Sequence, residues 1–308
     1  MHTPVLLKET VDSLAVKPGG VYIDGTLGRA GHAREILARA GKGARLVGID
    51  RDTQALKESA ERLGRVPGAS LALVHGCHGS IAQIVRAEGI DAVDGVLLDL
   101  GVSSPQLDEP QRGFSFRADG PLDMRMDQSR GETAADLLAT RSEAELEEII
   151  RALGEERNAR RIAKAIASAR LKARIATTAQ LASIVEKAVG RHGAHHPATR
   201  TFQALRMAVN DELGELERAL AGGIGLLKIG GRMAVITFES LTDRIVKRFF
   251  AAHEGRMSSL QGGGERWTGE TPRVRRVTRR AVRASQDEIA RNPRARSAKL
   301  RTVERIGE

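Results

Sequence analysis

The sequence contains one cysteine, few aromatic side chains and no long apolar run. Because Cys77 is alone, no disulfide can form within the chain, and we expect a reducing, cytoplasmic location. No apolar stretch approaches the roughly 20 residues that are needed to cross a bilayer. The N-terminus also lacks a basic region followed by an apolar run, so we predict neither a membrane anchor nor a secretory signal.

Positive charge is what the chain has in excess. Its 308 residues carry a formal net charge of +10, and residues 265–308 hold 13 Lys and Arg against 6 Asp and Glu. This C-terminal charge could form a solvated tail or a phosphate-binding surface. Residues 271–283, TPRVRRVTRRAVR, interleave arginines with valines, as in a strand or hairpin with one cationic face, which favours phosphate binding. With aromatics at only 3% of the chain, stacking platforms for single-stranded bases are sparse.

Short apolar, β-prone segments alternate with amphipathic helical segments in the first third of the chain. The four predicted strands are VYID, ARLVGID, SLALVHG and VDGVLLDL, and a glycine lies at the end of each intervening helix. Such alternation is typical of a parallel sheet that is covered by helices on both faces. We therefore predict an α/β fold with a ligand site at the carboxyl ends of its strands. Those ends carry Asp24, Asp50, His75–His78 and Asp99.

A different organisation begins after the fourth strand. A loop rich in Gly, Pro, Ser and Asp comes first, and it is longer than an ordinary connection. Helical segments follow, two of which start with capping-box sequences at 142–145 and 177–180. A fifth strand pattern, GGRMAVITFES, appears only in the last third of the chain. We therefore predict a discontinuous α/β domain, residues 1–111 and 198–308, interrupted by an all-helical insertion at 112–197.

The segment DGTLGRAGH places three glycines between the first strand and the following helix. Gly25, Gly28 and Gly31 would let the backbone approach a ligand closely, at a helix start with free N–H groups. Asp50 ends the next strand about 20 residues further on, where an acid suits the two hydroxyls of a ribose. The spacing G-x-x-G-x-x-G differs from the dinucleotide fingerprint, and Asp24 would oppose a pyrophosphate. These features favour S-adenosylmethionine (SAM) over a dinucleotide; a glycine-tolerant connection without a ligand also fits the pattern.

Asp99 ends the fourth strand, beside the place that the reactive end of a ligand on Asp50 would reach. An acceptor there could hydrogen-bond an exocyclic amine and fix the nitrogen lone pair toward a methyl group. Alignment of the reactants is the main task of a methyltransferase, because SAM already carries its leaving group. The alternative is that Asp99 only caps the turn that follows the strand.

The sequence resembles the bacterial 16S rRNA (cytosine-N4)-methyltransferase family from one end to the other. The motifs that carry the resemblance are, in order, HTPVLLKETV, YIDGTLGRAGH, GIDRD, DGVLLDLGVSSPQLDEPQRGFSF, GPLDMRMD, HPATRTFQALRMAVNDEL, GGRMAVITF, DRIVKRF and NPRARSAKLR. The resemblance implies a Rossmann-like class I SAM-dependent methyltransferase domain interrupted by a helical substrate domain. It also implies methylation of the N4 amine of a cytidine in the decoding region of 16S rRNA, within the small ribosomal subunit.

The family's cofactor contacts carry over to seven positions of this sequence. They are Ala30, Gly31, His32, Asp50, His78, Asp99 and Gln106, of which Asp99 is also the candidate catalytic residue. The family commonly has Gly where Ala30 stands, and alanine should be tolerated there unless φ is positive. An aromatic is common where His78 stands, and an imidazole can still lie flat against adenine. Glu239 and Thr242 also depart from the family pattern, and we assign Glu239 no catalytic role.

His32 has two possible roles, a cofactor contact at the helix start or a general base, and the sequence favours the contact. A cytosine amine scarcely needs prior deprotonation, so its proton can leave late, to Asp99 or to water. We predict no metal site. Three aspartates spaced by four, Asp119, Asp123 and Asp127, could bind a hard cation, but the interleaved arginines favour ion pairs.

Two other functions remain open from the sequence. One is a DNA amino-methyltransferase, although such enzymes usually place an aromatic soon after the equivalent of Asp99, where this chain has Leu100–Val102. The other is a non-catalytic, SAM-binding ribosome-assembly factor. We expect the basic helical segment NARRIAKAIASARLKAR to bind RNA phosphates, and affinity for RNA to fall steeply with salt. The sequence indicates no oligomeric state.

Overall fold

The computed structural model describes residues 4–64, 66–191, 196–259, 264–268 and 271–307. The chain divides into two compact units, which we call the sheet unit (Met1–Gly101 and Gly214–Glu308) and the helical unit (Val102–Leu213). The predicted insertion, 112–197, lies inside the helical unit, which extends further at both ends. At the C-terminal end this is because helix α10 packs against α7 of the helical unit.

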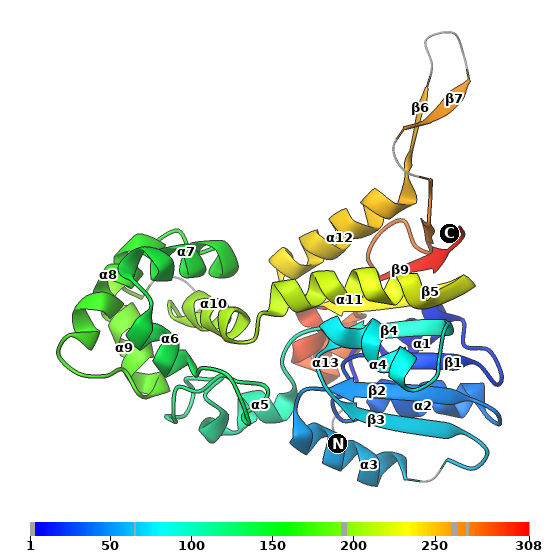
Figure 1. Ribbon diagram of the computed structural model, residues 1–308. Helices are drawn as coiled ribbons and strands as arrows, with labels where there is room; N and C mark the ends of the chain where they lie inside the picture. The colour runs from blue at the N-terminus through cyan, green and yellow to red at the C-terminus, as the bar shows by residue number, and fades with distance from the viewer. Residues whose placement is uncertain (1–3, 65, 192–195, 260–263, 269–270, 308) are drawn as a thin grey trace. The chain divides into compact units, whose positions relative to one another are not determined.

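The sheet unit contains a seven-stranded sheet in the order β3-β2-β1-β4-β5-β9-β8 (Figure 1). The strands are β1 (Val21–Asp24), β2 (Arg45–Asp50), β3 (Ser70–His75), β4 (Val93–Asp99), β5 (Leu227–Thr237), β8 (Val274–Arg276) and β9 (Lys299–Arg305). The first five are parallel, β9 is antiparallel to β5, and β8 is antiparallel to β9. The predicted α/β, Rossmann-like class I fold is confirmed, as are the five strands expected from the sequence.

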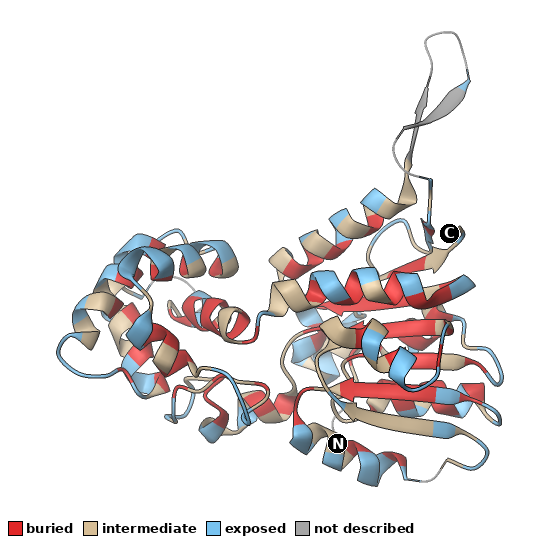
Figure 2. Ribbon diagram, viewed as in Figure 1, coloured by how far each residue is buried: buried red, intermediate tan, exposed pale blue. Residues whose placement is uncertain are grey.

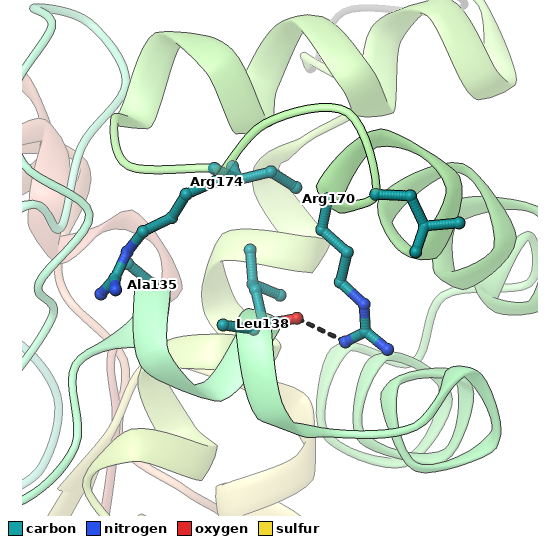
Figure 3. Close-up of a pocket in the computed structure, with 7 residues that line it drawn as sticks. Ala135, Leu138, Arg170 and Arg174 are labelled. Atoms are coloured by element: carbon teal, nitrogen blue, oxygen red, sulfur yellow. Dashed lines mark hydrogen bonds between the residues drawn. The ribbon is translucent and has the colours of Figure 1, made fainter.

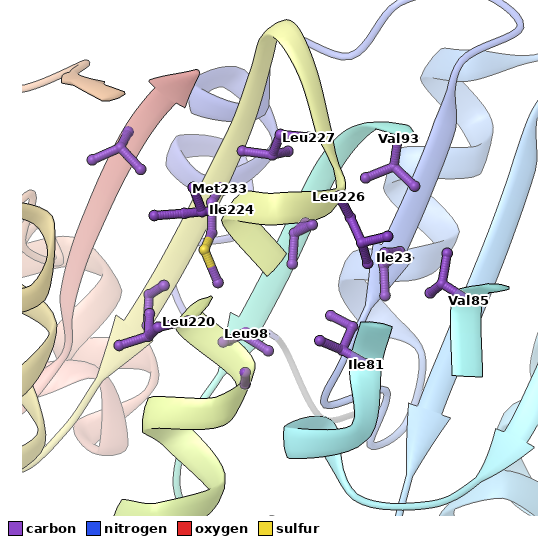
Figure 4. Packing of buried hydrophobic residues seen from close by; sticks show 14 of the residues in the cluster. Ile23, Ile81, Val85, Val93, Leu98, Leu220, Ile224, Leu226, Leu227 and Met233 are labelled. Atoms are coloured by element: carbon purple, nitrogen blue, oxygen red, sulfur yellow. The ribbon is translucent and has the colours of Figure 1, made fainter. Parts of the chain in front are cut away.

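Helices cover both faces of this sheet and bury its apolar side chains (Figure 2). The helices of this part are α1 (Leu7–Leu14), α2 (Gly31–Ala40), α3 (Thr53–Leu63), α4 (Ile81–Ala87), α11 (Glu212–Leu226), α12 (Ser240–Glu254) and α13 (Gln286–Arg291), with the short 3₁₀ turns η1 (His78–Ser80) and η3 (Pro293–Ser297). On one face, Ile81, Leu220 and Ile224 pack with strand residues such as Leu98 and Met233 (Figure 4). On the other face, α1 and α2 provide most of the packing. This double cover leaves the ends of the strands as the places where polar groups can gather.

Two segments near the C-terminus depart from this layered arrangement. Strands β6 (Arg256–Ser259) and β7 (Glu265–Thr268) pair with each other as a separate antiparallel ribbon. The basic segment 271–283 is not one continuous strand: only β8 is regular, and the chain returns to β9 at a single bridge, Val282 with Leu300. The interpretation of this segment as a strand with one cationic face therefore holds only for its first part.

The helical unit has an apolar core of its own. It consists of α5 (Ser104–Asp108), η2 (Pro110–Arg112), α6 (Ala134–Thr140), α7 (Glu143–Gly154), α8 (Ala159–Arg170), α9 (Thr178–Val189) and α10 (Thr199–Val209). Leu146, Ile162, Leu181 and Phe202 meet in this core. The two predicted capping boxes are confirmed at the starts of α7 and α9. Across the described residues of the chain, no helix combines the length and apolar character that crossing a membrane requires.

The long segment between η2 and α6 has little regular structure but is closely packed. Gly113 has φ +74°, and a Cβ at this position would lie 2.3 Å from the carbonyl oxygen of Pro121. Asn210, which is buried at the end of α10, donates from Nδ2 to the carbonyl of Met124 at 2.8 Å. Its Oδ1 accepts from the Met126 amide, also at 2.8 Å. A single side chain thus satisfies two buried backbone groups of the segment.

We expect Asn210→Ala to destabilise the helical unit by about 2 to 4 kcal/mol, because it leaves these buried backbone groups without partners. Urea unfolding followed by circular dichroism measures the change. Lys187→Ala, at an exposed position of α9, is the matched control and should change stability by less than about 0.5 kcal/mol. Equal stability of the Asn210 variant and the wild type would show that the segment is held by other contacts.

Candidate active site

The glycine turn between β1 and α2 is hydrogen-bonded to the ends of two neighbouring strands. The Gly28 amide donates to Asp50 Oδ2 at 2.8 Å, and Gly28 itself has φ +50°. The Asp99 amide donates to Thr26 Oγ1 at 2.6 Å. The turn is therefore fixed against the carboxyl ends of β2 and β4, which brings the first, second and fourth predicted strand ends together.

The start of α2 restricts which residues fit at positions 30 and 31, through backbone conformation at Ala30 and close packing at Gly31. Ala30 has φ 56° and ψ 25°, in the left-handed region. The condition under which alanine should be tolerated is therefore not met, and the methyl group costs roughly 1 kcal/mol of backbone strain. At Gly31 a Cβ would lie 2.1 Å from Cγ of Pro4. Only glycine lets the N-terminal segment pack against the turn at this point.

Three carboxyl groups end the neighbouring strands β1, β2 and β4. Asp24 is fully buried, and its Oδ1 accepts from the Thr26 amide at 3.1 Å. Asp50 accepts from the amides of Gly28 and Asp52. The Asp99 side chain is 26% exposed, yet its Oδ1 is buried and has no hydrogen-bond partner among the described residues. Sequence analysis placed these acids at one edge of the sheet, and the structure brings them together there.

Burial and mutual repulsion make these carboxyls weak acids. Burial raises the pKa of Asp24 to about 7, with a further contribution from the charge of Asp50. Burial likewise raises the pKa of Asp99 to about 7, and the charge of Asp24 adds to the effect. The pKa of Asp50 is also raised, mainly by burial, against the lowering effect of its backbone hydrogen bonds. Carboxylates only accept hydrogen bonds, so the group that suits this edge is a positively charged one with hydrogen-bond donors.

His32 lies beside Asp99 with its ring anchored to the backbone. Its Nε2 is 3.1 Å from the carbonyl oxygen of Val5. A carbonyl can only accept, so Nε2 carries the hydrogen, and in the singly protonated ring Nδ1 is the acceptor. That Nδ1 is 3.7 Å from Asp99 Oδ2, and the side chain is buried. The geometry suits a residue that positions Asp99 and can share a proton with it, as well as the expected cofactor contact.

His78 follows β3 in the 3₁₀ turn η1. Its Nε2 is buried and has no hydrogen-bond partner in the described part of the chain. Burial, with help from the charge of Arg51, lowers the pKa of His78 to about 4, so the ring is neutral at physiological pH. A neutral, flat ring with a free nitrogen is compatible with the predicted contact with adenine.

Sequence reasoning missed the acid that supports this turn. Glu215, at the start of α11, accepts from the Gly79 amide at 2.8 Å through Oε2. It also lies 3.7 Å from Arg51 and pairs with Arg218 at 2.9 Å. A distant glutamate within a helical pattern gives no sequence signal for this role, whereas Arg51 could have been suspected because it directly follows Asp50.

Gln106 belongs to the helical unit and caps α5. Its Oε1 accepts from the Ser103 amide at 2.9 Å, and the Ser103 hydroxyl accepts from the Gln106 amide at 3.4 Å. This capping box fixes the side chain locally. Its expected place at the methyl-transfer end of the cofactor stays a prediction.

The other residues singled out in the sequence have structural partners. Asp123 pairs with Arg125 and Asp127 with Arg130, each at 2.8 Å, which confirms the ion pairs predicted there. Glu239 precedes α12, and its carbonyl accepts from the Thr242 hydroxyl at 3.0 Å. Among the residues that the structure describes, no group of His, Cys, Asp and Glu is arranged to hold a metal ion.

The helical unit contains an open pocket of about 340 Å³ between α6 and the end of α8 (Figure 3). Its lining is Ala135, Leu138, Ala139, Arg170, Leu171, Arg174 and Ile175. Arg170 donates to the carbonyl of Leu138 at 2.6 Å, and Arg174 pairs with Asp136. Both guanidinium groups therefore have local partners, and the pocket includes none of the predicted site residues.

Comparison with known proteins identifies the family. The sequence matches the MraW methylase family over residues 1–306. The chain belongs to this family. MraW methylases are SAM-dependent methyltransferases, so this chain is an enzyme that uses SAM as its methyl donor.

Curated relatives match the MraW methylase chain over nearly its whole length. A protein of Azoarcus sp. (strain BH72) named ribosomal RNA small subunit methyltransferase H is 52% identical, and the match covers 99% of this chain and 97% of the relative. The protein of that name in Trichlorobacter lovleyi is 50% identical, and the match covers 99% of this chain and 98% of the relative. The protein of that name in Methylobacterium nodulans is 53% identical, covering 99% of this chain and 90% of the relative.

The residues at the carboxyl edge fit SAM. SAM carries ribose hydroxyls, an ammonium group and a sulfonium, which together supply donors and positive charge. Asp99 Oδ1 has no hydrogen-bond partner among the described residues, and Asp24 and Asp50 are weakly acidic carboxyls that accept from backbone amides. The chemistry of this set of acceptors therefore suits the cofactor that the family uses.

We expect the affinity for SAM to rise as the pH increases through about 7. The positive ligand stabilises ionised Asp99, so the complex binds fewer protons than the free protein, and binding releases protons near neutral pH. Titration calorimetry between about pH 5.5 and 7.5, in buffers of different ionisation enthalpy, measures both effects. In Asp24→Asn the midpoint of the affinity-against-pH curve should move to lower pH, because removing the neighbouring negative charge lowers the pKa of Asp99. An affinity that stays constant over this range would contradict the role of Asp99.

Proposed function

We propose that this MraW methylase transfers the methyl group of SAM to the N4 amine of a cytidine in 16S rRNA of the small ribosomal subunit. The names of the relatives, at 50–53% identity, support an rRNA substrate. The environment of Asp99 is the observation that favours an amine as the methyl acceptor. Its partly exposed carboxyl ends β4 beside His32, and its Oδ1 has no hydrogen-bond partner among the described residues. This substrate also agrees with the expected location of the enzyme in the cytoplasm.

SAM supplies an activated methyl group on a sulfonium and leaves as S-adenosylhomocysteine. The protein therefore needs to hold the two reactants in line and to accept a proton. In our proposal Asp50 binds the ribose hydroxyls, the turn at Ala30, Gly31 and His32 binds the methionine part, and His78 lies against the adenine.

Asp99 is the proposed catalytic residue. Its carboxylate accepts a hydrogen bond from the N4 amine, and this directs the nitrogen lone pair toward the methyl group. As the new C–N bond forms, the amine proton becomes acidic and passes to Asp99 or to water. His32 lies beside this carboxyl, with Nε2 bound to the Val5 carbonyl and Nδ1 3.7 Å from Asp99 Oδ2, so in our proposal it can take up the proton that Asp99 has accepted.

The rival functions are distinguished by the residues after β4 and by the product. Leu100, Gly101 and Val102 provide no aromatic side chain to stack a flipped base, which argues against a DNA amino-methyltransferase. A non-catalytic assembly factor would bind SAM without turnover. Incubation with labelled SAM and small ribosomal subunits, followed by nucleoside digestion and mass spectrometry, should yield N4-methylcytidine. Absence of a labelled nucleoside, with SAM bound, would support the assembly factor instead.

We expect Asp99→Asn to lower kcat by about 10² to 10³ while the Kd for SAM changes much less. The amide keeps the size of the side chain but removes its negative charge. That charge interacts most strongly with the amine in the transition state, where the amine proton becomes acidic. Single-turnover methylation of small subunits and calorimetry with SAM measure the two quantities. Asp91→Asn, an exposed carboxylate of the same unit, is the control. Normal turnover in the Asp99 variant would remove the residue from the mechanism.

A further inference from the structure

Two groups of basic residues at the C-terminal end of the sheet unit differ in whether they form ion pairs. Those of the first group pair with acids: Arg275 with Glu304, Arg276 with Glu254, and Lys299 and Arg301 with Asp243. These ion pairs connect β8, β9 and α12. Their charge is neutralised locally, so they hold the C-terminal strands in place and contribute little to binding an anion.

The second group consists of Arg279, Arg280 and Arg283, which we call the arginine trio. Their side chains are exposed, and none forms an ion pair with an acid among the residues that the structure describes. They lie where the chain leaves β9 after Val277 and returns to it at Val282. An interrupted edge strand thus presents three uncompensated positive charges within five residues of sequence.

Strand register places the trio at the same edge of the sheet as Asp99. Val282 bridges to Leu300, Leu300 pairs with Ile236, and Ile236 pairs with Asp99. Neighbouring strands are about 4.8 Å apart, so three such steps put Val282 and Asp99 about 14 Å apart along the sheet. Because β8 runs in the same direction as β5, the segment that follows β8 emerges at the carboxyl edge.

The trio also lies on the side of Asp99 away from the proposed cofactor contacts. Along the sheet the order is β2 with Asp50, β1 with Asp24 and β4 with Asp99, followed by β5, β9 and β8. If the ribose of SAM lies at Asp50 and the amine at Asp99, the cofactor occupies the β2 side. The nucleic acid must then approach from the side of β5, which is where the trio lies.

We propose that the arginine trio binds the sugar-phosphate backbone of the rRNA strand next to the target nucleotide. This inference rests on the proposed function and adds the surface that positions its substrate. Guanidinium groups bind phosphates through two parallel hydrogen bonds, and phosphate contacts set the position of a nucleic acid on a protein. The segment exposes arginines without exposed large apolar neighbours, which suits a polyanion better than an apolar protein surface.

The test compares two full-length variants with the wild type. The first is the triple variant Arg279→Gln, Arg280→Gln, Arg283→Gln. The second, a matched control, is Lys42→Gln, Lys57→Gln, Arg86→Gln, which removes the same charge from exposed positions near the amino edge of the sheet or on α3. Kd for SAM, KM and kcat with small ribosomal subunits, and the salt dependence of subunit binding are measured for each protein.

The trio variant should raise KM for small subunits at least about tenfold, with the Kd for SAM unchanged and kcat at saturation within about twofold. The slope of log affinity against log salt should fall by about 2, since each phosphate contact with a single strand contributes about 0.7. The control should match the wild type. Replacement by lysine at all three positions should restore most of the binding.

The inference fails if the trio variant keeps the wild-type KM and salt slope, or if the control loses as much affinity as the trio variant. A fall in kcat alone would equally overturn it. If the wild type binds small subunits but transfers no methyl group, the proposed function fails. The salt slopes of the two variants then still decide whether the trio binds RNA.

Discussion

The site depends on an unfavourable electrostatic arrangement, three carboxyl groups buried at the ends of adjacent strands. Among the described residues, no Lys or Arg side chain pairs with Asp24 or Asp99, and burial raises the pKa of both to about 7. Because the folded protein holds these protons more tightly than the unfolded chain does, ligand-free stability decreases as the pH rises from about 4 to 7. A cationic ligand offsets this loss of stability when it binds, because it stabilises the ionised carboxylates. The fold must therefore be held together elsewhere, by apolar helices on both faces of the sheet and by the ion pairs of its C-terminal strands.

The backbone around these acids explains why they stay close. Gly28 donates to Asp50, Thr26 connects the turn to β4, and Pro4 packs where Gly31 has no side chain. Each contact joins the turn to a different part of the sheet unit. The left-handed Ala30 shows that this geometry is kept even at a position where a methyl group is strained. Strain at such a position is tolerated because the surrounding contacts determine the conformation.

The sequence predicted the strands of the sheet and placed Asp24, Asp50 and Asp99 at their ends, because these features depend on local patterns. Apolar runs that end in these acids identify both the parallel sheet and its carboxyl edge. Contacts between distant segments left no such pattern. Glu215 supports η1 from a helix far along the chain, and the Val5 carbonyl fixes the tautomer of His32. The limit of the helical unit was also missed at its C-terminal side, because α10 packs on α7 although it directly precedes the helix that returns to the sheet.

Charges of opposite sign can share the carboxyl edge because distance and solvent separate them. The acids lie on β1, β2 and β4, where burial keeps the local dielectric low, whereas the arginine trio is exposed at the far side of the sheet. Three strand spacings put Val282, next to the trio, about 14 Å from Asp99 along the sheet, which exceeds the Debye length of about 8 Å at physiological ionic strength. The arginines therefore do not neutralise Asp99, and its carboxyl remains available to a cation or an amine. The same screening is consistent with our proposal that the trio binds phosphates while a positive cofactor binds at the acids of the same edge.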